Sequence, residues 1–348
     1  MPEKGEQQIK RLTIDQVAVQ AGVSKTTVSR YLNQRYDALS EDTRQRIHQV
    51  IEELNYHPNR IAQSLKARNS RMLGCLVSDI SNPFSSIIVK GINSVCTQAG
   101  YQLLLVDSED DPERERTGIQ DLLENQVDGL IVNTTGQNDE YLISLHQRGI
   151  PLVLADRCLS AAGMIDTVAT ENYHITYQCI TYLRGLGYEQ VAFFTQANRY
   201  VAPRILRFQA YSDAMRENFH HAGEEYMYQF DLEDTRDYVE KLRAFRERFP
   251  GQRLAVFAVN GVTMLHMLQG IQHAGIHIGK DFGVCGFDDW GWADLIPPGI
   301  TTITQDSWEV GRRAAELLLR RIRGAGPTGP VYEELPNRLM IRGSTVSG

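Results

Sequence analysis

The sequence predicts an α/β protein in which a small all-α domain precedes a larger, two-lobed domain built on parallel sheets. About the first 70 residues contain helix-capping residues and no strand-like apolar run. From Met72 onward, short apolar runs alternate with amphipathic stretches, as in a parallel sheet covered by helices on both faces. The alternation then occurs a second time, which predicts a second lobe and a ligand cleft between the lobes.

Three helices are expected in the N-terminal domain. Thr13 can cap the first helix, which Gly22 would end, while Ser24 and Ser40 can cap the second and third. The apolar positions of the third helix fall at helical spacing: Ile47, Val50, Ile51 and Leu54. A small residue, Ala18, stands four positions before the glycine of the sharp turn, so the first two helices are expected to form a helix-turn-helix.

The larger domain is expected to contain strands and helices in alternation. In the first lobe we expect strands at 73–77, 102–106, 130–133 and 152–154, and helices at 85–98, 113–125 and 139–147. In the second lobe we expect helices at 172–186, 205–219, 236–248 and 262–273, and strands at 191–194, 255–258 and 282–286. A final strand at 301–304 and a final helix at 308–323 are too few elements to form a lobe of their own, and we expect them to return to the first lobe.

Composition and charge are those of an ordinary globular protein. The formal net charge is −7, yet residues 1–71 hold more basic than acidic side chains, which weakly indicates a nucleic-acid-binding module. The cysteines are scattered without a C-x-x-C pair, which favours reduced thiols over a disulfide framework or a zinc site: Cys75, Cys96, Cys158, Cys179 and Cys285. Residues 1–10 are polar, without the apolar core of a secretory signal, and we expect a cytoplasmic location.

The second helix carries the strongest functional signal. It would present short donors and cations suited to base edges and phosphates: Lys25, Thr26, Thr27, Ser29 and Arg30. The alternative is an ordinary helical hairpin with a polar face.

Three separated motifs resemble the LacI/GalR family of bacterial repressors over nearly the whole chain. They are AGVSKTTVSRYLN with TRQRIHQVIEELNYHPNRIAQSL, then GCLVSDISNPFSSIIVKGI, and finally VCGFDDWGWADLIPPGITTITQD. The resemblance implies a homodimeric transcriptional regulator that binds operator DNA and a small-molecule effector. It also implies a periplasmic-sugar-binding-protein fold for the sensor, with domains at 1–58 (helix-turn-helix), 59–71 (hinge helix and linker) and 72–348 (effector binding and dimerisation).

The resemblance also assigns DNA-binding roles. Lys25, Thr26 and Arg30 match positions that face the major groove, whereas Ser24, Thr27 and Ser29 match phosphate-binding or capping positions. Thr13 joins this set, and Asn33 matches a contact to the DNA backbone. The loop at 34–39 is about one residue longer than the commonest family pattern, which puts its own DNA contacts in doubt, although Arg35 and Tyr36 could reach a phosphate.

Pro58 is expected to stop the third helix, and the segment after it is too short to be a stable isolated helix. By resemblance, Leu65 is the apolar wedge that enters the minor groove and kinks the duplex, with Asn59 and Ala62 beside it. The alternative is a passive linker with a half-buried leucine.

The expected cleft carries polar and aromatic side chains at family effector positions. These are Asp79, Phe84, Asp156, Arg157, Arg207, Asn260 and Asp288, a set suited to a polyol. Some of them have plain alternatives as turn or capping residues. The chain departs from many relatives, which have Asn-Asp where it has Asn260-Gly261, and Gly where it has Ala210, so ligand selectivity cannot be transferred.

A sugar acid, such as gluconate or a ketogluconate, is the effector class we expect. Arg157, Arg204 and Arg207 are candidate neighbours in the cleft, and a guanidinium suits a bidentate grip on a carboxylate. The segment YLNQRYDALSEDTRQRI also loosely resembles relatives that govern ketogluconate catabolism. A neutral hexose or pentose, and then a purine, remain alternatives.

Two other function classes were weighed. An enzyme is disfavoured because the chain lacks the G-x-G-x-x-G and G-x-x-x-x-G-K-[ST] motifs, so we expect no catalytic residues, no cofactor and no metal. A transport-associated sugar-binding protein is disfavoured by the polar N-terminus and the helix-turn-helix. Because no leucine heptad follows the last expected strand, we expect a homodimer and not a tetramer.

Overall fold

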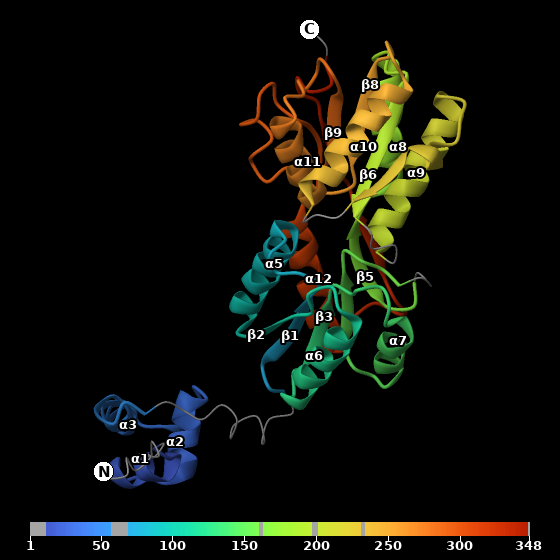
Figure 1. Cartoon of the computed structure of the whole chain (residues 1–348). Helices are drawn as coiled ribbons and strands as arrows, with labels where there is room; N and C mark the ends of the chain where they lie inside the picture. The colour runs from blue at the N-terminus through green and yellow to red at the C-terminus, as the bar shows by residue number, and fades with distance from the viewer. Residues whose placement is uncertain (1–11, 57–68, 160–162, 197–200, 231–233, 347–348) are drawn as a thin grey trace, which may run out of the picture. The chain divides into compact units, whose positions relative to one another are not determined.

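The computed structural model describes residues 12–56, 69–159, 163–196, 201–230 and 234–346. Contacts divide the chain into two units, Met1–Ser70 and Arg71–Gly348 (Figure 1). The expected hinge residues Asn59, Ala62 and Leu65 lie outside the described part of the chain.

The N-terminal unit contains the expected helices: α1 (Ile14–Gln20), α2 (Lys25–Leu32) and α3 (Glu41–Glu53), with a 3-10 turn at Tyr36–Ala38. A capping box opens α1, because the Thr13 N–H donates to Gln16 Oε1 at 2.8 Å while Thr13 Oγ1 accepts from the Gln16 N–H at 3.4 Å. The hydroxyls of Ser24 and Ser40 accept from the third residue of α2 and of α3. The capping residues therefore place all three helix starts as the sequence indicated.

Packing inside the N-terminal unit fixes the angle between α1 and α2. Its core contains Val17 and Ala18 of α1, Val28 of α2, and Ile47 and Val50 of α3, all buried. Gly22 lies in the turn with φ +62°, a left-handed conformation that glycine adopts without a Cβ penalty. The result is a helix-turn-helix whose second helix buries one side chain, Val28, and leaves its remaining residues exposed or half-buried.

The first lobe of the larger unit is a parallel sheet in the order β11-β5-β4-β3-β1-β2. Its strands are β1 (Met72–Val77), β2 (Gln102–Asp107), β3 (Gly129–Val132), β4 (Leu152–Ala155), β5 (Asp166–Thr170) and β11 (Tyr332–Leu335). Its helices are α5 (Pro83–Ala99), α6 (Pro112–Glu124), α7 (Asp139–Gln147) and α12 (Ser307–Ile322). Leu73, Cys75 and Val77 of β1 face one core with α5 and α12, whereas Leu76 faces the other core with α6 and α7.

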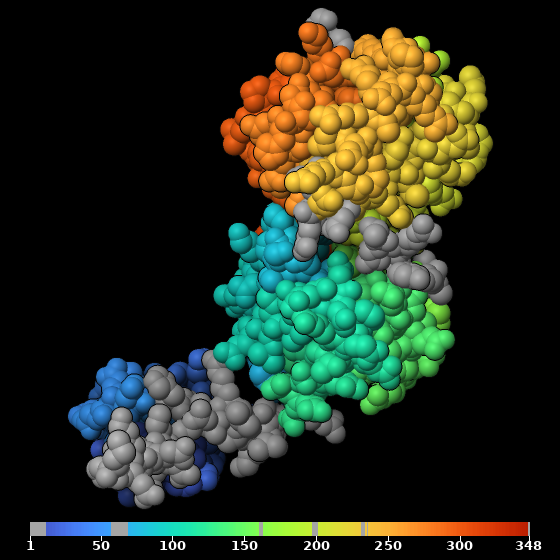
Figure 2. Space-filling view, in the orientation of Figure 1, coloured from blue at the N-terminus to red at the C-terminus, as the bar shows by residue number. Residues whose placement is uncertain are grey.

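The second lobe has the sheet order β12-β10-β9-β8-β6-β7, parallel except for β12. Its strands are β6 (Gln190–Gln196), β7 (Met227–Phe230), β8 (Leu254–Ala258), β9 (Gly283–Phe287), β10 (Thr301–Thr304) and β12 (Arg338–Met340). Its helices are α8 (Tyr173–Gly185), α9 (Ala202–Asn218), α10 (Thr235–Arg248) and α11 (Gly261–His273), with a 3-10 turn at Gly223–Tyr226. Figure 2 shows this lobe in yellow to orange and the first lobe in cyan to green.

The chain crosses between the lobes after β5, after β10 and after β11. The expectation that residues 301–304 return to the first lobe is wrong, because β10 pairs with β9 of the second lobe. Only the helix that follows returns, since α12 packs against α5 and the first-lobe strands (Figure 1). Within the described residues, no helix combines the length and apolarity needed to cross a membrane.

Candidate functional site

The exposed face of α2 carries the side chains expected to contact DNA. Lys25, Thr26 and Arg30 are exposed, and no hydrogen bond or ion pair joins the Arg30 side chain to another described residue. Lys25 Nζ instead lies 2.8 Å from Asp15 Oδ2 of α1. Both partners are more than half exposed, at 57% and 61%, so the pair is worth about 0–1 kcal/mol and Lys25 can exchange it for a phosphate or base.

Four other expected DNA contacts have local structural roles. Ser24 Oγ accepts from the Thr27 N–H at 3.1 Å and lies 2.8 Å from Thr27 Oγ1. Asn33 Nδ2 donates to the Ser29 carbonyl at 2.7 Å, at the end of α2. In the longer loop that follows, Tyr36 lies 4.3 Å below the Arg44 guanidinium, which fixes its ring. These side chains therefore shape both ends of α2.

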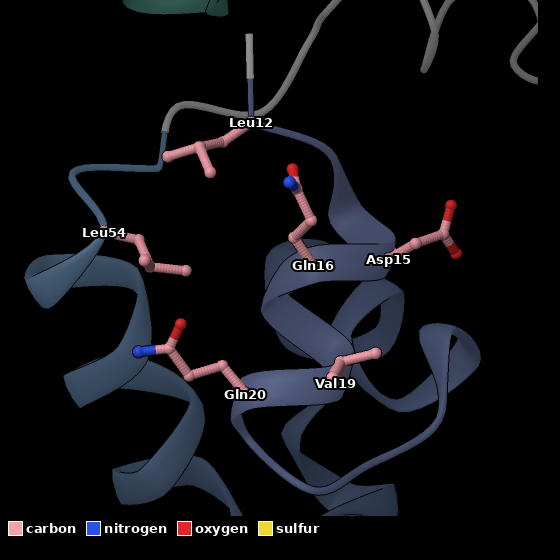
Figure 3. Close-up of a pocket in the computed structure, with 6 residues that line it drawn as sticks. All are labelled: Leu12, Asp15, Gln16, Val19, Gln20 and Leu54. Carbon is pink, nitrogen blue, oxygen red and sulfur yellow. The ribbon is translucent and has the colours of Figure 1, made fainter. Parts of the chain in front are cut away.

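A shallow depression lies on the opposite helix, α1. Figure 3 shows Leu12 and Leu54 beside the α1 residues Asp15, Gln16, Val19 and Gln20 that line it. Val19 is 83% exposed there. Asp15, which lines the depression, also pairs with Lys25 of α2, and we assign no ligand to the depression.

Two aspartates of the expected effector site occupy matching positions in the two lobes. Asp156 directly follows β4 with φ +70°, and Asp288 directly follows β9 with φ +75°. Each backbone N–H still donates to the next strand, Asp156 to the Val168 carbonyl at 2.7 Å and Asp288 to the Ile303 carbonyl at 2.9 Å. Left-handed non-glycine residues are uncommon and concentrate at functional sites. The carboxyl ends of the two sheets thus each present a buried carboxylate.

Arg207 of α9 is within electrostatic reach of both carboxylates and is only 4% exposed. Its Nε donates to Asn172 Oδ1 at 2.7 Å, its Nη1 to the Val259 carbonyl at 2.7 Å, and its Nη2 to Gln305 Oε1 at 3.0 Å. Its Cζ lies 3.4 Å from the centre of the Phe287 ring. Burial lowers the pKa of Arg207 to about 10, an effect that nearby Asp288 and Asp156 oppose. The guanidinium is therefore held rigidly, with two of its five N–H groups left for a ligand.

Two of the partners of Arg207, Asn172 and Gln305, lie at the crossovers between the lobes. Gln305 follows β10 and also donates to Asp288 Oδ1 at 2.6 Å. Thr170, the last residue of β5, donates its hydroxyl to Gln305 Oε1 at 2.6 Å, and Asn172 Nδ2 donates to the Thr170 carbonyl at 2.7 Å. A ligand that moves Arg207 would therefore act directly on two of the three chain crossings.

Arg157 and Arg204 add positive charge near Arg207. Arg157 is buried and donates to Asp110 Oδ1 at 2.9 Å and to the Thr134 carbonyl at 3.0 Å. The side chain of Arg204 makes no hydrogen bond or ion pair with another described residue. Burial lowers the pKa of Arg204 to about 10, and the charges of Arg157 and Arg207 add to this effect, while Asp110 and Asp156 oppose it. Arg204 therefore lies close to two other positive charges.

The remaining expected effector residues have other contacts. Asp79 Oδ1 accepts from the N–H and hydroxyl of Ser81, at 2.8 and 2.6 Å. Asn260 Oδ1 caps α11 by accepting from the Thr263 N–H at 2.9 Å. Phe84 is buried in the first-lobe core with α5 and α12. No contact found among the described residues joins these three side chains to the arginines.

Sequence reasoning missed Gln305, Thr170 and Asn172 as parts of this site, and it named Arg204 only as a possible cleft neighbour. Gln305 follows an expected strand directly, as the recognised aspartates do, and that position was the available signal. Thr170 was missed because β5, the strand that it ends, is not an apolar run and was not predicted.

Asp156 has a raised pKa of about 6, chiefly because burial removes water from its carboxylate. It is 8% exposed, and its Oδ1 has no hydrogen-bond partner among the described residues. Neighbouring Arg157 and Arg207 lower the pKa, whereas Asp288 raises it.

We expect Asp156→Asn to stabilise the folded protein at pH 7. The folded-state pKa exceeds the usual 3.8, so the contribution of Asp156 to stability is most favourable below about pH 4 and becomes unfavourable as the pH rises through about 6. The penalty that remains at pH 7 is on the order of 3 kcal/mol, and the asparagine lacks it. Urea unfolding at pH 4 and pH 7.5 measures this. Exposed Asp121→Asn is the control, and an equal effect of Asp156→Asn at both pH values would refute the assignment.

Two families match the chain. Residues 13–59 match the "Bacterial regulatory proteins, lacI family", and residues 180–345 match the "Periplasmic binding protein-like domain". The HTH-type transcriptional regulator KdgR of Bacillus subtilis is 39% identical over 333 residues, which cover 95% of this chain and 97% of that protein. PtxS of Pseudomonas putida, another HTH-type transcriptional regulator, is 36% identical over 335 residues, or 96% of each chain.

A solved structure shows the same architecture. A lac repressor dimer bound to operator and the anti-inducer ONPF has a TM-score of 0.84 and 27% identity, covering 97% of this chain and all (100%) of that one. The helix-turn-helix and the two-lobed α/β fold expected from the sequence are therefore confirmed. The chain belongs to the lacI family of bacterial regulatory proteins and is a DNA-binding transcriptional regulator.

Proposed function

We propose that this regulator binds operator DNA as a homodimer and that a sugar acid bound between its two lobes controls the binding. Each α2 would enter the major groove of one half-site, with Lys25, Thr26 and Arg30 toward the bases. The lac repressor structure that this chain resembles is a dimer bound to operator, which supports pairing of two chains. The named relatives are transcriptional regulators, so catalysis is no part of this proposal, and the place of action is the cytoplasm.

The observation that carries the sugar-acid assignment is Arg204. Arg204 is partly buried and has no hydrogen-bond or ion-pair partner among the described residues. Its pKa is lowered by burial and by two neighbouring arginines, so its side chain gains free energy when an anion binds. A guanidinium also grips a carboxylate through two parallel hydrogen bonds. The carboxylates Asp156 and Asp288 are suited to accept hydrogen bonds from the hydroxyls of the same ligand. A polyhydroxylated acid meets both requirements.

The network around Arg207 supports a route from effector to DNA. The ligand would use the remaining N–H groups of Arg207, and Arg207 is bonded to Gln305 and Asn172 at the lobe crossings. A change in those bonds changes the angle at which the lobes meet, which is hinge-type domain motion. The same coupling acts in reverse, so operator binding should change effector affinity by the same factor.

We expect Arg204→Gln to lose affinity for a sugar acid by about 100-fold while keeping its thermal stability. The loss reflects a charge-assisted pair worth about 3 kcal/mol at most, and stability is kept because Arg204 has no side-chain partner in the described part of the chain. Calorimetry with gluconate, 2-ketogluconate and glucose measures the affinities. Arg216→Gln on the exposed side of α9 is the matched control. Tight glucose binding without binding of either acid would end the sugar-acid proposal.

A neutral hexose or pentose is the second candidate. It is favoured by the two buried carboxylates, Asp156 and Asp288, because carboxylates accept hydrogen bonds from sugar hydroxyls. In that case Arg204→Gln would leave the affinity unchanged, and the same titrations separate the two candidates.

A further inference from the structure

Trp290 connects the two lobes beside the effector site. It lies two residues after Asp288, in the segment between β9 and β10 of the second lobe. Its indole is half-buried and packs against the first-lobe core that contains Phe84 and Ile88. A side chain from one lobe that contacts the core of the other is displaced whenever the lobes move.

Gly261 makes room for this indole. A Cβ added at Gly261 would lie 2.5 Å from Cη2 and 2.9 Å from Cζ2 of Trp290, and 2.8 Å from the Asp288 Cβ. Such distances exclude a side chain unless the indole moves. The Gly261 N–H also donates to Asp288 Oδ2 at 2.8 Å, so this crowded point adjoins a proposed effector ligand.

The pair Gly261 and Trp290 therefore keeps charge away from this wall of the site. An acidic side chain at 261 would stand beside the Asp288 carboxylate, and a second negative charge there would oppose an anionic ligand. The indole supplies an uncharged surface beside Asp288, and an apolar surface there would lower the local dielectric and strengthen the attraction between the arginines of the site and a carboxylate.

We propose that Trp290 is a specificity-determining residue of the effector site, which selects for an acid by forming an apolar wall over Gly261. This inference rests on the proposed sugar-acid function. It adds a residue outside the expected effector set and predicts a spectroscopic signal, because the indole should sense the ligand and the lobe closure directly.

The first test measures affinity. Trp290→Ala should weaken gluconate or 2-ketogluconate binding by about tenfold or more, and Trp290→Phe should keep most of the affinity because it retains an aromatic surface. The double variant Gly261→Asp/Trp290→Ala places a carboxylate where the indole stood, and it should lose acid binding while losing less affinity for glucose. Thermal midpoints and circular dichroism show whether each variant folds.

The second test uses fluorescence. The chain has three tryptophans, so Trp292→Phe/Trp308→Phe leaves Trp290 as its only indole. Its emission should change with the acid at the midpoint given by calorimetry. The inference is overturned if Trp290→Ala and the double variant bind the acid as tightly as wild type does and the emission stays constant. In that case the proposed function stands, because wild type still binds the acid. If wild type binds neither acid, the sugar-acid proposal fails and this inference fails with it.

Discussion

Arg207→Ala should abolish effector binding, with a loss of at least about 100-fold whichever class of sugar binds. The guanidinium is buried, and its stacking on Phe287 and bonds to Asn172, Val259 and Gln305 leave its free N–H groups in one orientation. A ligand that uses those groups loses hydrogen bonds to a charged donor, each worth about 1.5–3 kcal/mol. Calorimetry with the cognate sugar measures the loss.

The same substitution should also lower the thermal midpoint. Removing Arg207 takes from the buried Asp288 a cation that lowers its pKa, and leaves Asp156 with Arg157 as its neighbouring cation. Arg207→Lys keeps the charge, so it should recover most of the stability but only part of the binding, because an ammonium cannot reproduce the planar fork. Arg216→Ala, on the exposed side of α9, is the control. A folded Arg207→Ala protein with wild-type affinity would remove Arg207 from the site.

Arg30→Ala should weaken operator binding by about 1–3 kcal/mol, up to about 150-fold, and relax specificity at one base pair if Arg30 contacts a base. Its side chain is exposed on α2 without an ion-pair partner among the described residues, so no intramolecular bond has to be broken before it meets DNA. A gel shift with operator and scrambled duplexes separates base readout from phosphate binding. Loss of a phosphate contact would weaken binding to all sequences alike and flatten the dependence of affinity on salt.

Lys25→Ala should cost less than Arg30→Ala, because Lys25 gives up its contact with Asp15 when it binds DNA. Asp15→Asn should accordingly raise affinity slightly. Arg46→Ala changes the charge of the same domain on α3, where Arg46 pairs with Asp42, and it is the matched control. Wild-type operator affinity in both Arg30→Ala and Lys25→Ala would show that α2 is not the recognition helix.

The helices were largely readable from the sequence because their starts are local. Thr13, Ser24 and Ser40 each satisfy an N–H of the helix they precede, and this chemistry needs only neighbours in the chain. The long apolar strands were readable for a similar reason, since a run such as Leu254–Ala258 is buried on both faces of a parallel sheet. The family motifs lie on these elements, so fold class and regulator function followed from the sequence.

Four strands escaped prediction because their pairing is decided by distant residues. β5 has the sequence DTVAT and β11 the sequence YEEL, neither of which is an apolar run, yet they pair with each other across nearly half of the chain. β7 and β12 lie at the two edges of the second-lobe sheet, where less apolar surface is required. Register and sheet order are non-local, and a single sequence contains no direct record of them.

The composition of the effector site was decided at the same tertiary level. The sequence by itself determined that Asp156 and Asp288 each end a strand and that arginines lie in the second lobe. Only the folded chain brings Arg207 within electrostatic reach of both carboxylates, joins it to Gln305, and places Arg204 near two other arginines. It also brings Trp290 over Gly261. The physical reason is that burial and charge compensation depend on which side chains meet across the lobes, and their sequence positions are far apart.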